Sequence, residues 1–263
     1  MTISNSVTGT TEPRIRAAIA QAASRTGVDF DYLYNQARIE SSLDPEARAR
    51  TSSAAGLYQF TKQTWLQVVK AHGADHGLGW AAEAIDKSGS GYQVADPSMR
   101  TAIDNLRYDP ELASTMAGEF ASDNRDKLES SLGRTAEPVD LYLAHFMGAK
   151  GASDFLSAYD ADPSMAAAPL FTAAAAANHS IFYAPDGSAR SLGEIRSNFA
   201  TKLGGSAPAA PQMATVTWTQ QRRNVAEATD RAPLQMASIE PMPQTLSVDY
   251  ARRAYNRLAG LGQ

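Results

Sequence analysis

Residues 39–45 read Ile39-Glu40-Ser41-Ser42-Leu43-Asp44-Pro45, and residues 55–60 read Ala55-Gly56-Leu57-Tyr58-Gln59-Phe60. The first stretch places a glutamate near the proline-marked end of an apolar segment. The second stretch begins 15 residues after the glutamate and contains a glycine, a glutamine and two aromatic residues. Together they predict a carboxylate at the end of a helix, followed by a polar and aromatic loop.

The helix before this carboxylate is expected over residues 28–42. Asp29 can cap its first turn, and Pro45 pushes the preceding residue out of the helical region. Glu40 lies three residues after Ala37 and therefore continues the apolar stripe of the helix. The residues that define this stripe are Phe30, Leu33, Tyr34 and Ala37.

This position gives Glu40 the properties of a proton donor. Partial burial and the negative end of the helix dipole both disfavour an ionised carboxylate. A carboxyl group that keeps its proton near neutral pH can act as a general acid. The alternative is a structural glutamate at the edge of the apolar face, with its carboxylate in water.

Composition limits the classes of protein to consider. The chain has 263 residues, 43% of them hydrophobic and 20% charged, with a net charge of -4 and no cysteine. This excludes disulfides and thiol catalysis, and it argues against a nucleic-acid surface. No apolar run reaches the length of a membrane span, and residues 1–13 lack the apolar core of a signal peptide.

The periodicity of the chain predicts a mainly α protein. We expect a flexible tail over 1–12, a helical domain over 13–203, a linker over 204–246 and a short helix over 247–263. Within the domain, further helices are predicted over 14–25, 61–71, 109–129 and 138–147. Residues 87–94, which contain Ser-Gly-Ser-Gly, are interpreted as a loop.

The C-terminal part differs in composition from the domain. Prolines recur between Pro208 and Pro243, among many Ala, Thr and Gln residues, which is typical of a linker. Residues 247–263 regain helical periodicity and carry arginines on the polar face. This helix either docks on a protein partner or packs back on the domain as a latch.

Gln59 and its neighbours suit the recognition of a carbohydrate. Its amide can both donate and accept hydrogen bonds, as sugar hydroxyl and N-acetyl groups require. Tyr58 and Phe60 offer aromatic surface for sugar rings. The alternative is an ordinary loop of small residues that leads into a helix.

A third segment, residues 142–152, is an apolar helix end followed by glycines. Tyr142 and His145 share a helical face, so either could border a cleft. The alternative is a buried helix whose histidine bonds a backbone carbonyl. A metal site at His72 and His76 is discounted because glycines interrupt that helix, and no cofactor is expected.

In order and spacing, the three segments resemble the soluble lytic murein transglycosylase (SLT) domain, a goose-lysozyme-like family. The resemblance covers residues 13 to about 160 and implies a lysozyme-like helical fold. It implies that Glu40 is the single catalytic acid/base and that Gln59 lies in the sugar-binding groove. The expected substrate-binding residues are Ser41, Tyr58, Gln59, Phe60, Tyr142 and His145.

The third segment departs from the family pattern. Most members read Ala-Tyr-Asn-Ala-Gly, whereas this chain has Ala144-His145-Phe146-Met147-Gly148. His145 thus replaces the tyrosine that contacts the active site, and Tyr142 lies one turn earlier. Position 58, usually methionine, is tyrosine.

The activity that the resemblance implies is cleavage of peptidoglycan glycan strands in the periplasm, with a 1,6-anhydro product. Two rivals are a lysozyme-like muramidase and a non-catalytic peptidoglycan-binding assembly protein. Such enzymes open the wall for envelope-spanning machines, so we expect residues 247–263 to recruit flagellar or secretion machinery.

Overall fold

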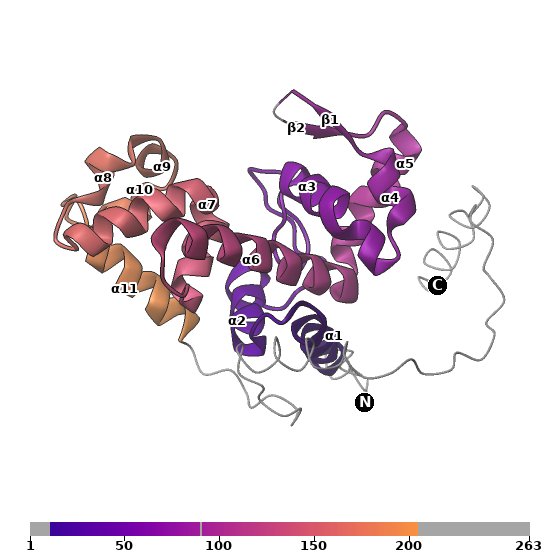
Figure 1. Ribbon diagram of the computed structural model, residues 1–263, viewed down its shortest axis with the longest axis horizontal. Helices are drawn as coiled ribbons and strands as arrows, with labels where there is room; N and C mark the ends of the chain where they lie inside the picture. Colours follow the sequence, from indigo (N-terminus) through magenta and orange to yellow (C-terminus); the bar gives the residue numbers. More distant parts are fainter. Residues whose placement is uncertain (1–10, 90, 205–263) are drawn as a thin grey trace, which may run out of the picture. The chain divides into compact units, whose positions relative to one another are not determined.

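The computed structural model describes residues 11–89 and 91–204 (Figure 1). The predicted linker from residue 205 onward and the predicted helix over 247–263 lie outside the described residues. The described chain is mainly helical, as predicted. Its first helix begins at Thr11, two residues inside the range expected as a tail.

The described residues form two compact units, 11–61 together with 107–204, and 62–106. The helices of the first unit are α1 (Thr11–Thr26), α2 (Phe30–Ser41), α6 (Pro110–Leu132), α7 (Pro138–Ala161), α8 (Ala167–Leu170), α9 (Thr172–Ala177), α10 (His179–Phe182) and α11 (Leu192–Leu203). The second unit contains α3 (Lys62–His72), η2 (Gly73–His76), α4 (Gly79–Ala84), β1 (Asp86–Ser88), β2 (Gly91–Gln93) and α5 (Pro97–Asn105). A 3-10 turn, η3 (Leu106–Tyr108), leads from the second unit back into the first.

The first unit is organised around the long helix α6. This helix packs along α1 and α7, and α7 in turn packs on α11 (Figure 1). Helix α2 contacts α1, α6 and α11. The core between them is mainly apolar, with Ile19, Leu33, Met116 and Leu143 each fully buried. This packing gives α2 fixed neighbours on several sides, which is what a functional side chain at its end requires.

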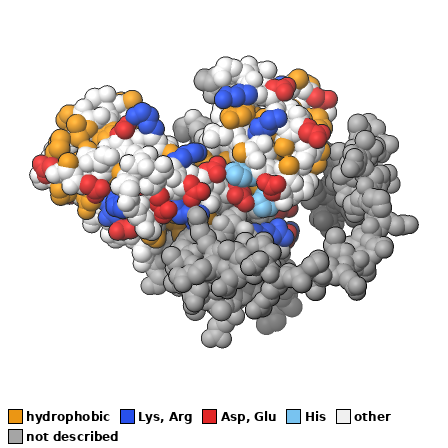
Figure 2. Space-filling model, in the orientation of Figure 1, with side chains coloured by type: hydrophobic (Ala, Val, Ile, Leu, Met, Phe, Trp, Pro, Cys, Tyr) orange, Lys and Arg blue, Asp and Glu red, His pale blue; other side chains and the backbone are white. Residues whose placement is uncertain are grey.

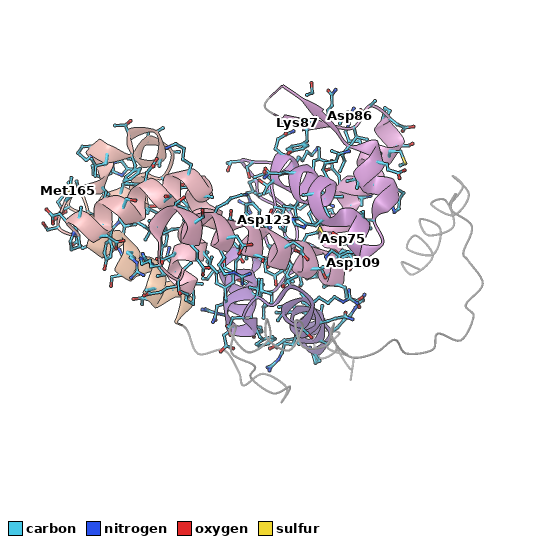
Figure 3. The ribbon with its side chains drawn as sticks, in the orientation of Figure 1. Asp75, Asp86, Lys87, Asp109, Asp123 and Met165 are labelled. Atoms are coloured by element: carbon cyan, nitrogen blue, oxygen red, sulfur yellow. The ribbon has the colours of Figure 1, made fainter. Side chains whose placement is uncertain are left out.

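Aspartates begin two of these helices. Asp29 accepts a hydrogen bond from the Tyr32 amide at 3.0 Å, which confirms it as the cap of α2. Asp109 accepts from the amides of Glu111 and Leu112 at the start of α6 (Figure 3). Both carboxylates also lie where the helix dipole favours negative charge.

Helix α7 contains a break at Gly148, whose φ of 77° and ψ of 157° are not helical. The prediction of a helix over 138–147 followed by a glycine turn therefore describes its first half. A second helical segment then continues to Ala161. Glycine suits this position because other residues rarely adopt a positive φ. The break changes the direction of the chain directly after the face that carries Tyr142 and His145.

The interpretation of residues 87–94 as a loop is wrong in part. Strands β1 and β2 pair as an antiparallel hairpin, with Asp86 opposite Gln93 (Figure 3). The Gln63 side chain both donates to and accepts from the backbone of Tyr92, at 2.9 and 2.8 Å. The side-chain amide of Gln63 therefore pairs with the backbone of Tyr92 as the backbone of a neighbouring strand would. Each strand has only three residues, too few for a period-two pattern to be visible in the sequence.

The surface of the described residues is mixed in charge. On the face shown in Figure 2, acidic and basic side chains are interspersed. Met165 and Leu170 are the large hydrophobic residues most exposed to solvent in the described part. No helix there combines the length and the apolar character needed to cross a membrane.

Candidate active site

Glu40 lies in the last turn of α2, at the edge of the core. Its side chain is 19% exposed, while Leu33 and Ala37 on the same stripe are fully buried. The stripe predicted from the sequence is therefore confirmed. The carboxylate ends an apolar face but keeps access to solvent, as a group that exchanges protons with a ligand must.

One oxygen of Glu40 is held by two side chains from α7. The Tyr142 hydroxyl donates to Glu40 Oε1 at 3.1 Å, and His145 Nε2 lies 3.2 Å from the same oxygen. The two rings stack with their centroids 5.9 Å apart, so the predicted shared face is confirmed. His145 thus faces a carboxylate rather than a backbone carbonyl. Within the described residues, Glu40 Oε2 has no hydrogen-bond partner.

Tyr142 remains a hydrogen-bond donor over a wide pH range. Burial raises the pKa of its phenol, and the negative charge of Glu40 and their mutual hydrogen bond raise it further. The pKa of the neighbouring Tyr32 is also raised, first by its complete burial. Neutral phenols therefore surround the carboxylate on its core side, and Oε1 stays occupied by a donor.

Ser41 connects the first sequence motif to the second. Its single hydroxyl hydrogen lies within reach of two carbonyl oxygens, that of Leu57 at 2.8 Å and that of Ala37 at 3.0 Å, and the Leu57 oxygen is the nearer acceptor. Ser42 and Leu43 have positive φ values of 57° and 65°, which end the helix and turn the chain. Ser41 therefore holds the 55–60 loop against the end of α2, which explains the spacing of the two motifs.

Close backbone packing and side-chain hydrogen bonds shape the 55–60 loop. Gly56 has a φ of 79°, and a Cβ atom there would overlap the Arg107 carbonyl, so only glycine fits. Gln59 also has a positive φ, of 47°. Its Nε2 donates to the carbonyls of Ala47 and Gly56, at 3.2 and 2.9 Å. These bonds stabilise an unusual backbone conformation and leave the amide oxygen Oε1 for other partners.

Tyr58 and Phe60 are core residues. Tyr58 is fully buried with its hydroxyl beside Ser114, and burial raises its pKa. Phe60 is 3% exposed and packs edge-on against Phe120 of α6, at 6.3 Å. Their rings are therefore not available to stack on a sugar, contrary to the expectation from sequence.

A pocket of about 500 Å³ brings together four of the seven predicted site residues. This volume lies within the range usual for ligand sites. Ser41, Tyr58 and Phe60 do not line it, whereas Phe146 and Asn178 line it without having been predicted as site residues. Its full lining is Glu40, Ala54, Gln59, Thr61, Tyr142, His145, Phe146 and Asn178.

Helix α11 supports the residues that hold Glu40. The Phe199 ring contacts Tyr142 and Phe146 edge-on, with centroids 5.3 and 5.4 Å away. Arg38 of α2 donates to the Lys202 carbonyl at 2.9 Å and so ties the two helices together. The replacement of a polar residue by Phe146 is thus explained by packing. The apolar spacing of residues 192–203 was the signal in the sequence that could have indicated this helix.

A buried carboxylate fixes the start of α7. Asp140 is completely buried and accepts from Arg196 of α11 at 3.0 and 3.2 Å, and from Arg134 at 2.7 Å. The same aspartate caps the helix by accepting from the Glu137 amide. Two cations and an amide satisfy this carboxylate, which a buried charge requires. Asp140 lies two residues before Tyr142, so this cluster helps to place the tyrosine.

A second hollow, of about 590 Å³, is larger but less suited to chemistry. Two of its carboxylates, Asp29 and Glu137, serve as a helix cap and as an ion-pair partner of Arg196. In the described part of the chain, no group of three or more histidine or acidic residues is arranged to hold a metal ion. The pocket at Glu40 is therefore the candidate active site.

Residues 17–78 match the family model of the transglycosylase SLT domain. This range contains Glu40, Ser41 and the loop that presents Gln59, and it ends before Tyr142 and His145. The match agrees with the first two sequence motifs and confirms the resemblance drawn from them. The chain therefore carries a region of the transglycosylase SLT type, with Glu40 at its centre.

Proposed function

We propose that this protein is a lytic transglycosylase that cleaves the β-1,4 bond between N-acetylmuramic acid and N-acetylglucosamine. The SLT match indicates an activity of the transglycosylase type on peptidoglycan. The observation that carries the finer proposal is the state of Glu40. One of its oxygens accepts a hydrogen bond from Tyr142 and lies 3.2 Å from His145 Nε2, and no other carboxylate among the described residues lines its pocket.

The arrangement of donors determines where the catalytic proton resides. Glu40 Oε1 accepts from Tyr142 and lies beside His145 Nε2, whereas Oε2 has no hydrogen-bond partner among the described residues, so we place the proton of the neutral acid on Oε2. Oε2 can then donate to the glycosidic oxygen as the bond from that oxygen to C1 of the muramic acid breaks. The leaving sugar departs with a new hydroxyl group, and positive charge develops at C1.

The second half of the reaction uses the same carboxylate as a base. Ionised Glu40 takes the proton of the C6 hydroxyl as that oxygen bonds to C1, which forms a 1,6-anhydro ring and consumes no water. Glycosidases that hydrolyse their substrate generally use a second carboxylate as base or nucleophile. Asp44 and Glu46 are exposed and do not line the pocket, so a single-carboxylate cycle suits this site better.

The test is a digest of purified peptidoglycan, with the products identified by mass spectrometry. A transglycosylase releases muropeptides one water lighter than those of a muramidase. Hydrated ends would contradict the proposal and favour the lysozyme-like alternative. Binding to the wall without any cleavage would favour a non-catalytic assembly protein.

For the biological role, we propose local opening of the wall in the periplasm around an envelope-spanning machine. Support comes from the sequence pattern of residues 247–263, which lie outside the described part. Deletion of residues 246–263 is expected to abolish capture of the partner and to leave activity on isolated walls unchanged. Loss of both would contradict recruitment and favour the latch.

A further inference from the structure

Asn178 lines the Glu40 pocket from the junction of α9 and α10, far beyond the region that matches the family model. Its Nδ2 donates to the Ala174 carbonyl at 3.1 Å. Its backbone amide donates to the same carbonyl, and its backbone oxygen accepts from the Ile181 amide, each at 2.9 Å. Every polar atom of this residue except Oδ1 therefore has a partner in the described structure.

The free oxygen is unexpected at this position in a helix. Asn178 is the N-cap residue of α10, where an asparagine oxygen normally accepts from a backbone amide of the first turn. No such side-chain bond is present here. The side chain is half-buried at a pocket wall, so its oxygen is available to a ligand rather than to the helix.

Gln59 repeats this arrangement on another wall of the pocket. Its nitrogen is held by two backbone carbonyls, and its Oε1 has no partner among the described residues. Because each amide nitrogen is bound to a carbonyl, the orientation of both amides is determined. Two primary amides thus present acceptor oxygens to the pocket that contains the free oxygen of Glu40.

We propose that Asn178 is a further substrate-binding residue, whose Oδ1 accepts a hydrogen bond from an N-acetylated glycan. Together with Gln59 Oε1, it selects ligand groups that donate, namely amide N–H and hydroxyl groups. A lining rich in acceptors also disfavours an anionic group at this place, because the residues that line the pocket include no lysine or arginine to neutralise it. This inference rests on the proposed function, since it specifies how that substrate is held.

The test compares wild type and Asn178→Ala in steady-state cleavage of purified peptidoglycan and in Tm. Removal of one neutral hydrogen bond to the substrate is expected to raise KM about five- to tenfold, with kcat within about twofold. Asn198→Ala, an exposed asparagine of α11, serves as the matched control and should change neither constant.

Two results would overturn this role for Asn178. If Asn178→Ala leaves KM unchanged while wild type cleaves the wall, the oxygen does not contact substrate and the proposed function stands. If Asn178→Ala raises KM and also lowers Tm by several degrees, the bond to Ala174 is what matters. A wild-type protein that neither binds nor cleaves the glycan would overturn both proposals together.

Discussion

At the level of single residues, the polar contacts of the Glu40 carboxylate with the described residues all involve one of its two oxygens, Oε1. Tyr142 and His145 both approach Oε1, which leaves Oε2 to exchange a proton with a ligand. Side chains that hold a catalytic carboxylate in one orientation reduce the reorganisation needed in the transition state. We infer that Tyr142 and His145 position Glu40, and we propose that the amides of Gln59 and Asn178 contact the substrate.

Tyr142→Phe tests this division of roles. The variant keeps the ring and removes the donor to Glu40, so kcat is expected to fall about tenfold while KM changes little. Tyr159→Phe, on the same helix but outside the pocket, is the control and should behave as wild type. An effect on KM alone would instead place the Tyr142 hydroxyl on the substrate.

At the scale of elements, the site depends on contacts between helices that are distant in sequence. Ser41 ties α2 to the Gln59 loop, and α11 supports both α2 and the face of α7 that carries Tyr142. Phe199 is the central contact of α11 because it packs on Tyr142 and Phe146 together. The orientation of Tyr142 therefore depends on a helix that the family match does not include.

Phe199→Leu should lower kcat by more than its loss of folding stability can explain. Loss of the ring frees Tyr142 to turn away from Glu40, so we expect kcat to fall about fivefold, with a loss of about 1 kcal/mol in stability. Phe155→Leu is the matched control, because that ring is also buried in the first unit and packs on Phe171. Equal losses of kcat in the two variants would show that α11 has no specific positioning role.

Ser41→Ala tests whether the hydrogen bond between Ser41 and the Leu57 carbonyl contributes to stability. The Leu57 carbonyl loses a donor at 2.8 Å, which is expected to cost about 1 kcal/mol and to lower Tm by about 2–4 °C. Calorimetry of this variant beside Ser197→Ala, an exposed serine of α11, gives the measurement. An unchanged Tm would mean that the loop is held at α2 by other contacts.

At the scale of the whole molecule, buried tyrosines govern the response to alkaline pH. Burial is the main cause of the raised pKa values of Tyr32, Tyr58 and Tyr142. Tyrosines of the unfolded chain titrate near pH 10, whereas these three keep their protons in the folded state. Their contribution to stability is therefore complete below about pH 10 and is lost as the pH rises above it.

The expected result is a steep loss of stability between about pH 10 and pH 11, of up to about 1.4 kcal/mol per tyrosine and pH unit. Urea denaturation across this range measures it. Tyr58→Phe removes one titrating group and should make the decline shallower. A free energy of unfolding that stays constant over the range would contradict the burial of these phenols.

The sequence was sufficient for features that depend on neighbouring residues. The stripe of α2, its Asp29 cap and the position of Glu40 follow from helical periodicity and end signals. The burial of Phe60 could not be predicted, because it depends on packing against Phe120 of α6. The pocket positions of Asn178 and Phe146 likewise result from the way α7 to α11 pack, which periodicity does not encode.

Cleavage of purified peptidoglycan by three carboxylate variants tests whether Glu40 is the single catalytic carboxylate that we propose. We expect Glu40→Gln to lose activity by a factor of about 100 or more while remaining folded. Asp44→Asn and Glu46→Gln, which lie outside the pocket, should retain most of it. Substantial cleavage by Glu40→Gln, or its abolition in either of the other two variants, would contradict a single catalytic carboxylate.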